Sequence, residues 1–297
     1  MKKLKYICIG PAHPYRGGTA NFNESLCRSL LENGIQSEIY TFKYQYPGFL
    51  FPGKTQYDES DPPENLKITK AIHSVSLFNW RKTAKKIIDT KPDLLIIHFW
   101  MPFMAPSLGK IARLVKRKTQ AKVIAITHNV IPHEKRPGDN LLIKYFVNSC
   151  DGFVSLAKSV LDDLSQFTEN KNKLFFPHPI YDIFGQKVPK TEAKTYLKLD
   201  EEQKYLLFFG IIRHYKGLDI LIEALGNKIL KNENIKLIVA GEFYQDKKIY
   251  TGLAEKLKIT DKIWFVDQFI PKEEVKYYFC ASDLIVQPYR SATQSGV

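Results

Sequence analysis

Short runs of apolar residues recur along the chain, and segments with helical periodicity separate them. Several of these runs are apolar throughout, which is typical of parallel strands that are covered on both faces. The alternation of strand and helix predicts an α/β protein with parallel sheets. The predicted strands are residues 4–9, 36–42, 93–98, 122–127, 152–155, 205–209, 236–240, 262–266 and 283–287.

Helices are predicted between these runs from periodicity and from end signals. Apolar residues at i, i+3, i+4 and i+7 form one stripe over residues 218–225. The helix after the first strand is predicted to end at Asn33-Gly34, a C-cap signal. A further helix is predicted over residues 191–197. Residues 43–65 are rich in Pro, Gly, Tyr and acidic residues, and they are predicted to form a long loop.

The chain is expected to form two domains. Its 297 residues exceed the size at which a single hydrophobic core stops growing. Pro177 and Pro179 exclude a continuous helix or a central strand over residues 176–181, and the strand–helix pattern restarts after them. We therefore predict one domain over residues 1–180 and a second over residues 181–297.

The second predicted domain is expected to be incomplete. Its last strand runs into residues 288–297, which contain no helical pattern, so its sheet would have about four strands and no closing helix. A doubly wound domain normally has more strands and a helix on each face. The sequence is therefore interpreted as a chain cut short inside its second domain.

Composition and charge narrow the class of protein. Hydrophobic residues make up 44% and charged residues 25%, no apolar run approaches the roughly 18 residues of a membrane span, and the four cysteines form no CxxC pair. These features predict a cytoplasmic location. The net charge of +13 is concentrated before residue 185, where 26 basic and 16 acidic residues give +10, and it suggests a polyanionic partner. Only 8 of the 44 basic residues are Arg, which argues against base-reading nucleic-acid recognition.

Glycines follow the first predicted strand. Gly17 and Gly18 lie at a strand-to-helix turn, where backbone N–H groups and the helix dipole favour an anion. Pro11 and Pro14 occupy the loop, so this is not the GxGxxG pattern of dinucleotide binders. The motif predicts phosphate or sugar contact, and a tight turn without a ligand is the alternative.

The most specific motif is Gly210-Ile-Ile-Arg213-His-Tyr-Lys216-Gly217, between an apolar strand and an amphipathic helix. Arg213 and Lys216 stand over a helix N-terminus, where positive charge is locally unfavourable. The two cations are favourable there if a dianion binds at the same place, because both could bind a diphosphate and neutralise its charge when it departs as a leaving group. A solvated basic turn is the alternative interpretation.

Two histidines follow neighbouring strands. His128 and His98 lie at the carboxyl ends of predicted strands, where ligands bind in open α/β sheets. A purely structural histidine is the alternative at each position. His133 and Glu134 lie close to His128 in sequence, but their spacing lacks the helical HExxH pattern, so no metal site is predicted.

Other strand ends in the second half carry weaker signals. Glu242, after Gly241, could accept a hydroxyl hydrogen bond, and the backbone of Phe269 and Ile270 could meet a flat base. Plain loops are the alternative. The helix over residues 110–118 combines Lys and Arg with an apolar face, a pattern compatible with anionic lipid headgroups or with a solvated surface.

Taken together, these motifs resemble the glycosyltransferase family 4 enzymes of the GT-B fold, which are bacterial retaining transferases that use nucleotide-sugar donors. The resemblance covers essentially the whole chain, and the Lys-Gly-helix and Ala-Ser-Asp-strand-Pro blocks are its most specific parts. The segments that carry it are Gly17-Gly18 and residues 98–107, 127–129, 177–182, 209–224, 269–275 and 281–288.

The resemblance implies two facing Rossmann-like parallel-sheet domains, with the acceptor on the first and the nucleotide sugar on the second. It also implies roles for individual residues. Catalysis is assigned to His128, Arg213 and Lys216; donor binding to Gly17, Gly18, Gly210, Gly241, Glu242, Phe269, Ile270 and Thr293; and the acceptor side to His98 and His133.

The sequence departs from the family pattern in two places. Ile211 and Ile212 separate the strand's glycine from Arg213, although the family's Arg usually follows that glycine directly. Thr293 stands where the family has a Glu, three residues before Gly296.

The activity implied by the resemblance is retaining transfer of a sugar from a UDP- or GDP-linked donor, without a metal or cofactor, to a glycan or a lipid-linked acceptor in cell-surface polysaccharide synthesis. The implied location is the cytoplasm, with an anionic inner-membrane surface as a further partner, and no nucleic acid is implied. Three alternatives remain: a non-catalytic binding protein on the same scaffold, an NAD-type oxidoreductase and a nucleotide-sugar epimerase.

Overall fold

The computed structural model describes residues 3–48, 55–58, 60–132 and 135–291. The chain divides into two compact units, and along the sequence the division falls between residues 179 and 180. Each unit is an α/β body built on its own parallel sheet.

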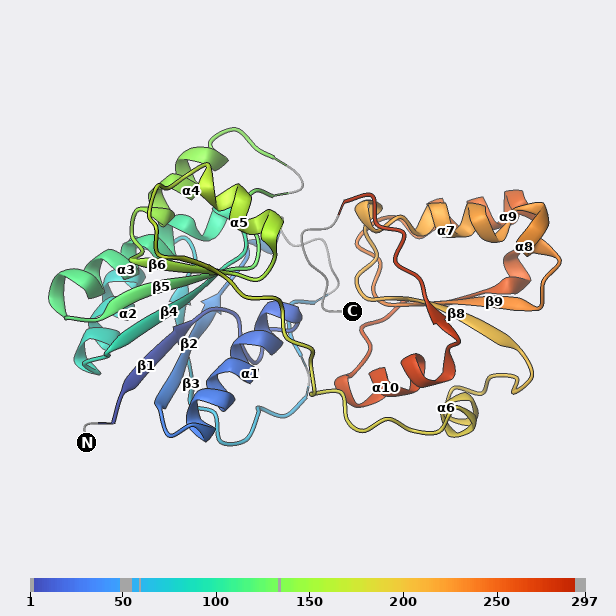
Figure 1. Cartoon of the computed structure of the whole chain (residues 1–297), viewed down its shortest axis with the longest axis horizontal. Helices are drawn as coiled ribbons and strands as arrows, with labels where there is room; N and C mark the ends of the chain where they lie inside the picture. The colour runs from blue at the N-terminus through green and yellow to red at the C-terminus, as the bar shows by residue number, and fades with distance from the viewer. Residues whose placement is uncertain (1–2, 49–54, 59, 133–134, 292–297) are drawn as a thin grey trace. The chain divides into compact units, whose positions relative to one another are not determined.

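The first unit contains a seven-stranded sheet in the order β3-β2-β1-β4-β5-β6-β7, and all of its pairings are parallel (Figure 1). Its main elements are β1 (Lys5–Ile9), α1 (Gly18–Glu32), β2 (Gln36–Tyr44), β3 (Ile68–His73), α2 (Leu77–Asp89), β4 (Leu94–Phe99), α3 (Ala105–Lys118), β5 (Lys122–Thr127), α4 (Asp139–Val147), β6 (Gly152–Ser155), α5 (Lys158–Ser165) and β7 (Lys173–Phe175).

Successive side chains of the central strands point to opposite faces of the sheet, and different helices pack on the two faces. Ile97 and Phe99 of β4 point into the main core, where they pack with residues of α2, α3, α4 and α5. His98 lies between them in sequence and so faces the opposite side, toward Phe22 of α1. The side of the sheet that α1 covers is therefore the side that carries the histidine.

The second unit contains a four-stranded parallel sheet in the order β10-β9-β8-β11. One apolar cluster joins it to α7 and α9, and a second joins its other face to α10, so helices cover both faces (Figure 1). Its elements are α6 (Lys190–Tyr196), β8 (Lys204–Phe209), α7 (Leu218–Leu225), α8 (Lys228–Lys231), β9 (Ile235–Ala240), α9 (Lys248–Leu257), β10 (Ile263–Val266), α10 (Lys272–Ala281) and β11 (Leu284–Ile285).

Each of the nine predicted strands is present, and the prediction of parallel sheets is confirmed. The prediction missed β3, an outer strand of the first sheet, and β7, a three-residue strand at its other edge. The loop predicted from residue 43 begins later, because β2 continues to Tyr44. The last strand was predicted too long, since β11 spans only Leu284–Ile285.

Candidate functional site

The loop after β1 is held in place by side chains of α1 and β2. Glu24 Oε1 accepts the backbone N–H of His13 at 2.7 Å, and Thr41 Oγ1 accepts that of Ala12 at 3.0 Å. Gly17 has a φ of +113° and precedes α1, and no side chain caps the helix there. Gly18, the first residue of α1, is exposed. The predicted turn therefore presents an accessible helix N-terminus, which is favourable for an anion.

Gly10 allows the same loop to approach β4 closely. A Cβ atom at Gly10 would lie 2.9 Å from Cβ of His98, a separation that side chains do not adopt. The glycine at the end of β1 is therefore required by packing against the histidine, which is a structural reason for a residue in the predicted ligand loop.

His98 and His128 form a buried pair on the α1 side of the sheet. His98 Nδ1 and His128 Nε2 are 2.9 Å apart, and the edge of the Phe22 ring packs on both imidazoles. His98 is fully buried and His128 is 6% exposed, so only His128 reaches the surface. Burial lowers the pKa of His98 to about 3, and burial followed by the nearby His98 and His178 lowers the pKa of His128 well below its ordinary value. Both rings are therefore neutral at pH 7.

The pair has a preferred arrangement of hydrogens. His98 Nε2 is buried and has no hydrogen-bond partner among the described residues. A buried N–H without an acceptor is rare in proteins, so the hydrogen of His98 is better placed on Nδ1, where it donates to His128 Nε2. The hydrogen of His128 is then on Nδ1. The structure brings the two predicted histidines together, with His98 behind His128.

A third histidine, not predicted from the sequence as a site residue, lies beside this pair. The ring of His178 packs edge-on against Phe22, at 5.3 Å between centroids, and its backbone N–H donates to Leu156 O. His178 follows β7 and lies in the proline-containing segment that the sequence marks as a domain boundary. The segment 177–182 is one of those that carry the family resemblance, but the resemblance assigns no role to His178 itself.

In the second unit, the loops after β8 and β9 run together beyond the sheet. Ile212 donates its N–H to Glu242 O at 2.9 Å and accepts that of Tyr244 at 3.1 Å. Gly210 and Gly241 have φ of +96° and +149°, and a Cβ at Gly241 would lie 2.0 Å from Gly210 O. Only glycine fits at Gly241, because both the backbone angle and the space exclude a side chain.

The side chain of Lys216 lies close to the backbone at Gly210. An ideal Cβ at Gly210 would lie only 3.0 Å from Lys216 Nζ, and the ammonium stands 5.6 Å from the centre of the Tyr289 ring. Burial, and to a smaller extent Arg213, lower the pKa of Lys216 to about 8. Among the described residues, neither Lys216 nor Arg213 has a carboxylate within ion-pair distance. Two neighbouring cations without an acidic partner leave positive charge that a bound anion would neutralise.

The N-terminus of α7 completes this basic loop. Gly217 has a φ of +72° and precedes α7, and a Cβ there would lie 2.1 Å from Pro288 O. The segment after β11 therefore packs directly on the start of the helix. Arg290, which that segment carries, donates to both carboxylate oxygens of Asp219, at 2.7 and 2.6 Å. Neither Asp219 nor Arg290 was predicted as a site residue, although Asp219 belongs to a block that carries the resemblance and Arg290 follows another.

The remaining predicted donor residues have mixed positions. Glu242 is buried with an exposure of 3%, and Ile270 is part of the apolar cluster with α10, whereas Phe269 is half-buried. The predictions for His133 and Thr293 lie outside the described residues.

Metal ligands and membrane spans are both missing from the described part of the chain. No group of three or more His, Cys, Asp or Glu side chains is arranged there to hold a metal ion. Over the same residues, every helix is too short or too polar to cross a bilayer.

Comparisons with known proteins match both units. The family described as Glycosyltransferase Family 4 matches residues 16–175, and the one described as Glycosyl transferases group 1 matches residues 189–294. The uncharacterized glycosyltransferase MJ1607 of Methanocaldococcus jannaschii is 22% identical, over 96% of this chain and 74% of that protein. The alpha-monoglucosyldiacylglycerol synthase of Streptococcus pneumoniae is 26% identical, over 52% of this chain and 35% of that protein.

Solved structures with the same fold are numerous. The sucrose-phosphate synthase of Thermosynechococcus elongatus superimposes with a TM-score of 0.71 at 15% identity, over 99% of this chain and 77% of that one. Anabaena HepE in complex with UDP and glucose superimposes with a TM-score of 0.69 at 13% identity, over 96% of this chain and 74% of that one. At these identities the likeness concerns the fold.

Proposed function

The chain belongs to glycosyltransferase family 4 and is a transferase enzyme of the GT-B fold; on that premise we propose that it moves a sugar from a nucleoside-diphosphate donor to an acceptor hydroxyl with retention at the anomeric carbon. The observation that carries this proposal is the half-buried ammonium of Lys216, which lies beside Gly210 without a carboxylate partner in the described chain. A diphosphate is the part of the donor that such a cation would bind.

In this proposal, the second unit binds the donor and stabilises the leaving group. Arg213 and Lys216 contact the diphosphate, and Gly210 and Gly241 let the phosphates approach the backbone. Negative charge grows on the departing diphosphate in the transition state, and each preorganised donor that meets it is worth roughly 3 kcal/mol. The structures of Anabaena HepE with UDP and with UDP-glucose support a nucleotide sugar as the donor class. UDP-linked and GDP-linked sugars remain the two donor types to test.

The first unit supplies His128 beside the donor sugar. Its Nδ1–H is a hydrogen-bond donor at the edge of the buried pair, and His98 acts as a positioning residue that fixes the orientation and the tautomer of His128. A neutral histidine suits a hydroxyl of the sugar better than it suits the diphosphate, because it carries no charge at pH 7. Gly17 and Gly18 contact the donor through the N-terminal end of α1.

The acceptor is proposed to be a glycan or a lipid-linked glycan of the cell surface. The relatives include an alpha-monoglucosyldiacylglycerol synthase and a putative teichuronic acid biosynthesis glycosyltransferase of Bacillus subtilis, whose names indicate a glycolipid and teichuronic acid as products. The proposed location is the cytoplasm, with peripheral association at the inner face of the plasma membrane. The proposed reaction requires neither a metal nor a cofactor.

A donor screen tests the proposal. The full-length protein is incubated with UDP- and GDP-sugars, and donor hydrolysis and transfer are followed by mass spectrometry. We expect turnover with at least one donor and a loss of at least 100-fold in the Arg213→Ala/Lys216→Ala variant. Lys248→Ala, at an exposed lysine of α9, is the matched control and should keep full turnover. Equal turnover in the double variant would refute the assigned roles, and binding without turnover would favour the non-catalytic alternative.

A further inference from the structure

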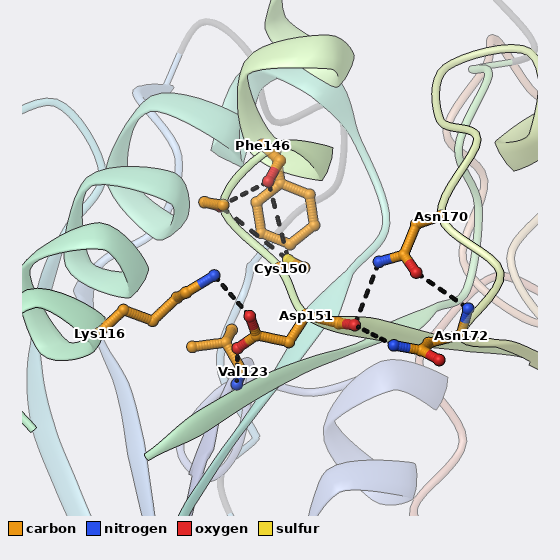
Figure 2. Close-up of polar contacts among 8 residues, drawn as sticks. Lys116, Val123, Phe146, Cys150, Asp151, Asn170 and Asn172 are labelled. Carbon is orange, nitrogen blue, oxygen red and sulfur yellow. Dashed lines mark hydrogen bonds and ion pairs between the residues drawn. The ribbon is translucent and has the colours of Figure 1, made fainter. Parts of the chain in front are cut away.

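The basic helix singled out in the sequence is α3, and the structure uses part of its charge internally. Lys116 Nζ pairs with Asp151 Oδ1 at 2.7 Å, while Asp151 Oδ2 accepts the N–H of Val123 at 2.8 Å (Figure 2). Arg113 lies over the Tyr145 ring of α4, 3.7 Å from its centre, and donates to Tyr145 O. At these two positions the cations join α3 to its neighbours, so they do not form a free cationic surface.

A different surface of the first unit combines exposed apolar side chains with unmatched charge. Val75, which precedes α2, is 53% exposed, and Leu77 and Phe78 at the start of α2 are 59% and 83% exposed, although α2 buries Trp80 and Ile87. Large apolar side chains at consecutive exposed positions are unusual on a water-facing helix, and such patches mark interaction sites.

The charge next to these side chains has a single sign. Residues 66–88 contain six Lys and Arg residues and no Asp or Glu. Four of the six lie on the exposed side of α2, and of these only Lys85 has a carboxylate partner, Asp89, among the described residues. We call the following set the α2 surface: Val75, Leu77, Phe78, Arg81, Lys82 and Lys86.

The turn that carries the apolar side chains is firmly held. Asn79 accepts the N–H of His73 at 2.7 Å and donates to Ala71 O at 2.8 Å, and the indole N–H of Trp80 donates to His73 O at 2.6 Å. Ser76 caps the N-terminus of α2 through its side chain. Leu77 and Phe78 therefore stand on an ordered helix start, so little ordering entropy opposes their binding.

We propose that the α2 surface docks on an anionic lipid bilayer, with Leu77 and Phe78 in the interfacial layer and Arg81, Lys82 and Lys86 against headgroup phosphates. The pairing of an apolar tip with a ring of cations is the pattern of interfacial helices. A second copy of the chain is a poor occupant, because a twofold interface brings the same cations together. The inference rests on the proposed function, since it holds the enzyme where a lipid-linked acceptor lies.

Vesicle co-sedimentation tests this inference with three variants of the intact chain. The vesicles contain either phosphatidylcholine alone or an equal mixture with phosphatidylglycerol. The apolar variant is Leu77→Ser/Phe78→Ser and the charge variant is Arg81→Glu/Lys82→Glu. The matched control is Lys248→Glu/Ile249→Ser on α9, which also removes an exposed apolar side chain and a neighbouring cation. Circular dichroism establishes that each variant is folded.

We expect the wild type to bind only the anionic vesicles and to lose affinity as salt is raised. The charge variant should bind at least tenfold more weakly, because each cation near an anionic surface contributes about fivefold. The apolar variant should also bind at least tenfold more weakly, because it removes the two apolar side chains that enter the interfacial layer. The control should stay within twofold of wild type. Absence of wild-type binding, equal binding by the α2 variants, or loss of a dimer in the apolar variant would overturn the inference. Donor hydrolysis measured without vesicles reports the proposed function separately, and the α2 variants should leave it unchanged.

Discussion

The low pKa of Lys216 makes a direct prediction about stability. Burial, and then Arg213, lower this pKa from 10.5 to about 8. A difference of one in pKa between folded and unfolded states corresponds to about 1.4 kcal/mol. Holding the ammonium charged in the protein without a bound anion therefore costs about 3 kcal/mol of folding free energy at pH 7. Lys216→Met, which keeps much of the length of the side chain and removes the charge, should recover much of this cost.

The sign of the pH dependence follows from proton linkage. Between pH 8 and pH 10.5 the unfolded chain holds the lysine proton more firmly than the folded chain, so wild-type stability rises with pH across this window. Below pH 8 the cost is fully present, and above pH 10.5 it is gone. The advantage of Lys216→Met over wild type should thus be about 3 kcal/mol at pH 7 and should shrink toward zero near pH 10.5.

Urea denaturation of the intact chain at several pH values between about 7 and 10 measures this difference. Lys248→Met, at an exposed lysine of the same unit, is the control and should differ from wild type by the same small amount at every pH. UDP should stabilise wild type more than Lys216→Met at pH 7, because the diphosphate offsets the buried charge. A difference between Lys216→Met and wild type that stays constant with pH, or a variant less stable at pH 7, would refute the reasoning.

Three further predictions concern other parts of the candidate site. In wild type, ¹⁵N NMR should show His128 protonated at Nδ1, and an Nε2–H tautomer would contradict the proposed arrangement. His98→Leu should move this hydrogen away from Nδ1 and lower kcat at least tenfold. Asp219→Asn should lower the midpoint of urea unfolding at pH 7, because Arg290 lowers the pKa of Asp219 in the folded protein. The difference in midpoint between variant and wild type should disappear as the pH falls below 3.8, and a difference that persists would argue against this ion pair. Treatment with EDTA should leave the rate of transfer unchanged, and restoration of a lost rate by Mg²⁺ would disprove the metal-independent reaction.

The strands that could be predicted from the sequence are recognised by their apolar composition. Buried parallel strands such as β4 and β8 contain unbroken apolar runs, Leu94–Ile97 and Tyr205–Phe209, because helices cover both of their faces. The missed strands β3 and β7 lie at the edges of the first sheet, where Lys70 and Lys173 interrupt the apolar pattern. An edge strand is stabilised by its neighbour's backbone, which no local pattern reports.

For the basic residues too, local sequence predicts one part of the structure and the fold decides another. The sequence marks α3 as the cationic helix, but the partners of Lys116 and Arg113 are Asp151 and Tyr145, which lie 35 and 32 positions away. The exposure of Phe78 could not be predicted either, because an apolar residue at a helix start is usually buried. Only the packing of α2 decides which of its side chains face water.

Short-range patterns in the amino-acid sequence determine the parallel α/β class, the glycines at strand ends, and the lysine and arginine that precede α7. The hydrogen bond between His98 and His128, the space at Gly10 and Gly217, and the contact of Arg290 with Asp219 depend on residues far apart in sequence. Burial and partner choice are properties of the folded chain, because they are set by which distant segments pack together. They determine the protonation state of each site residue and therefore its chemistry.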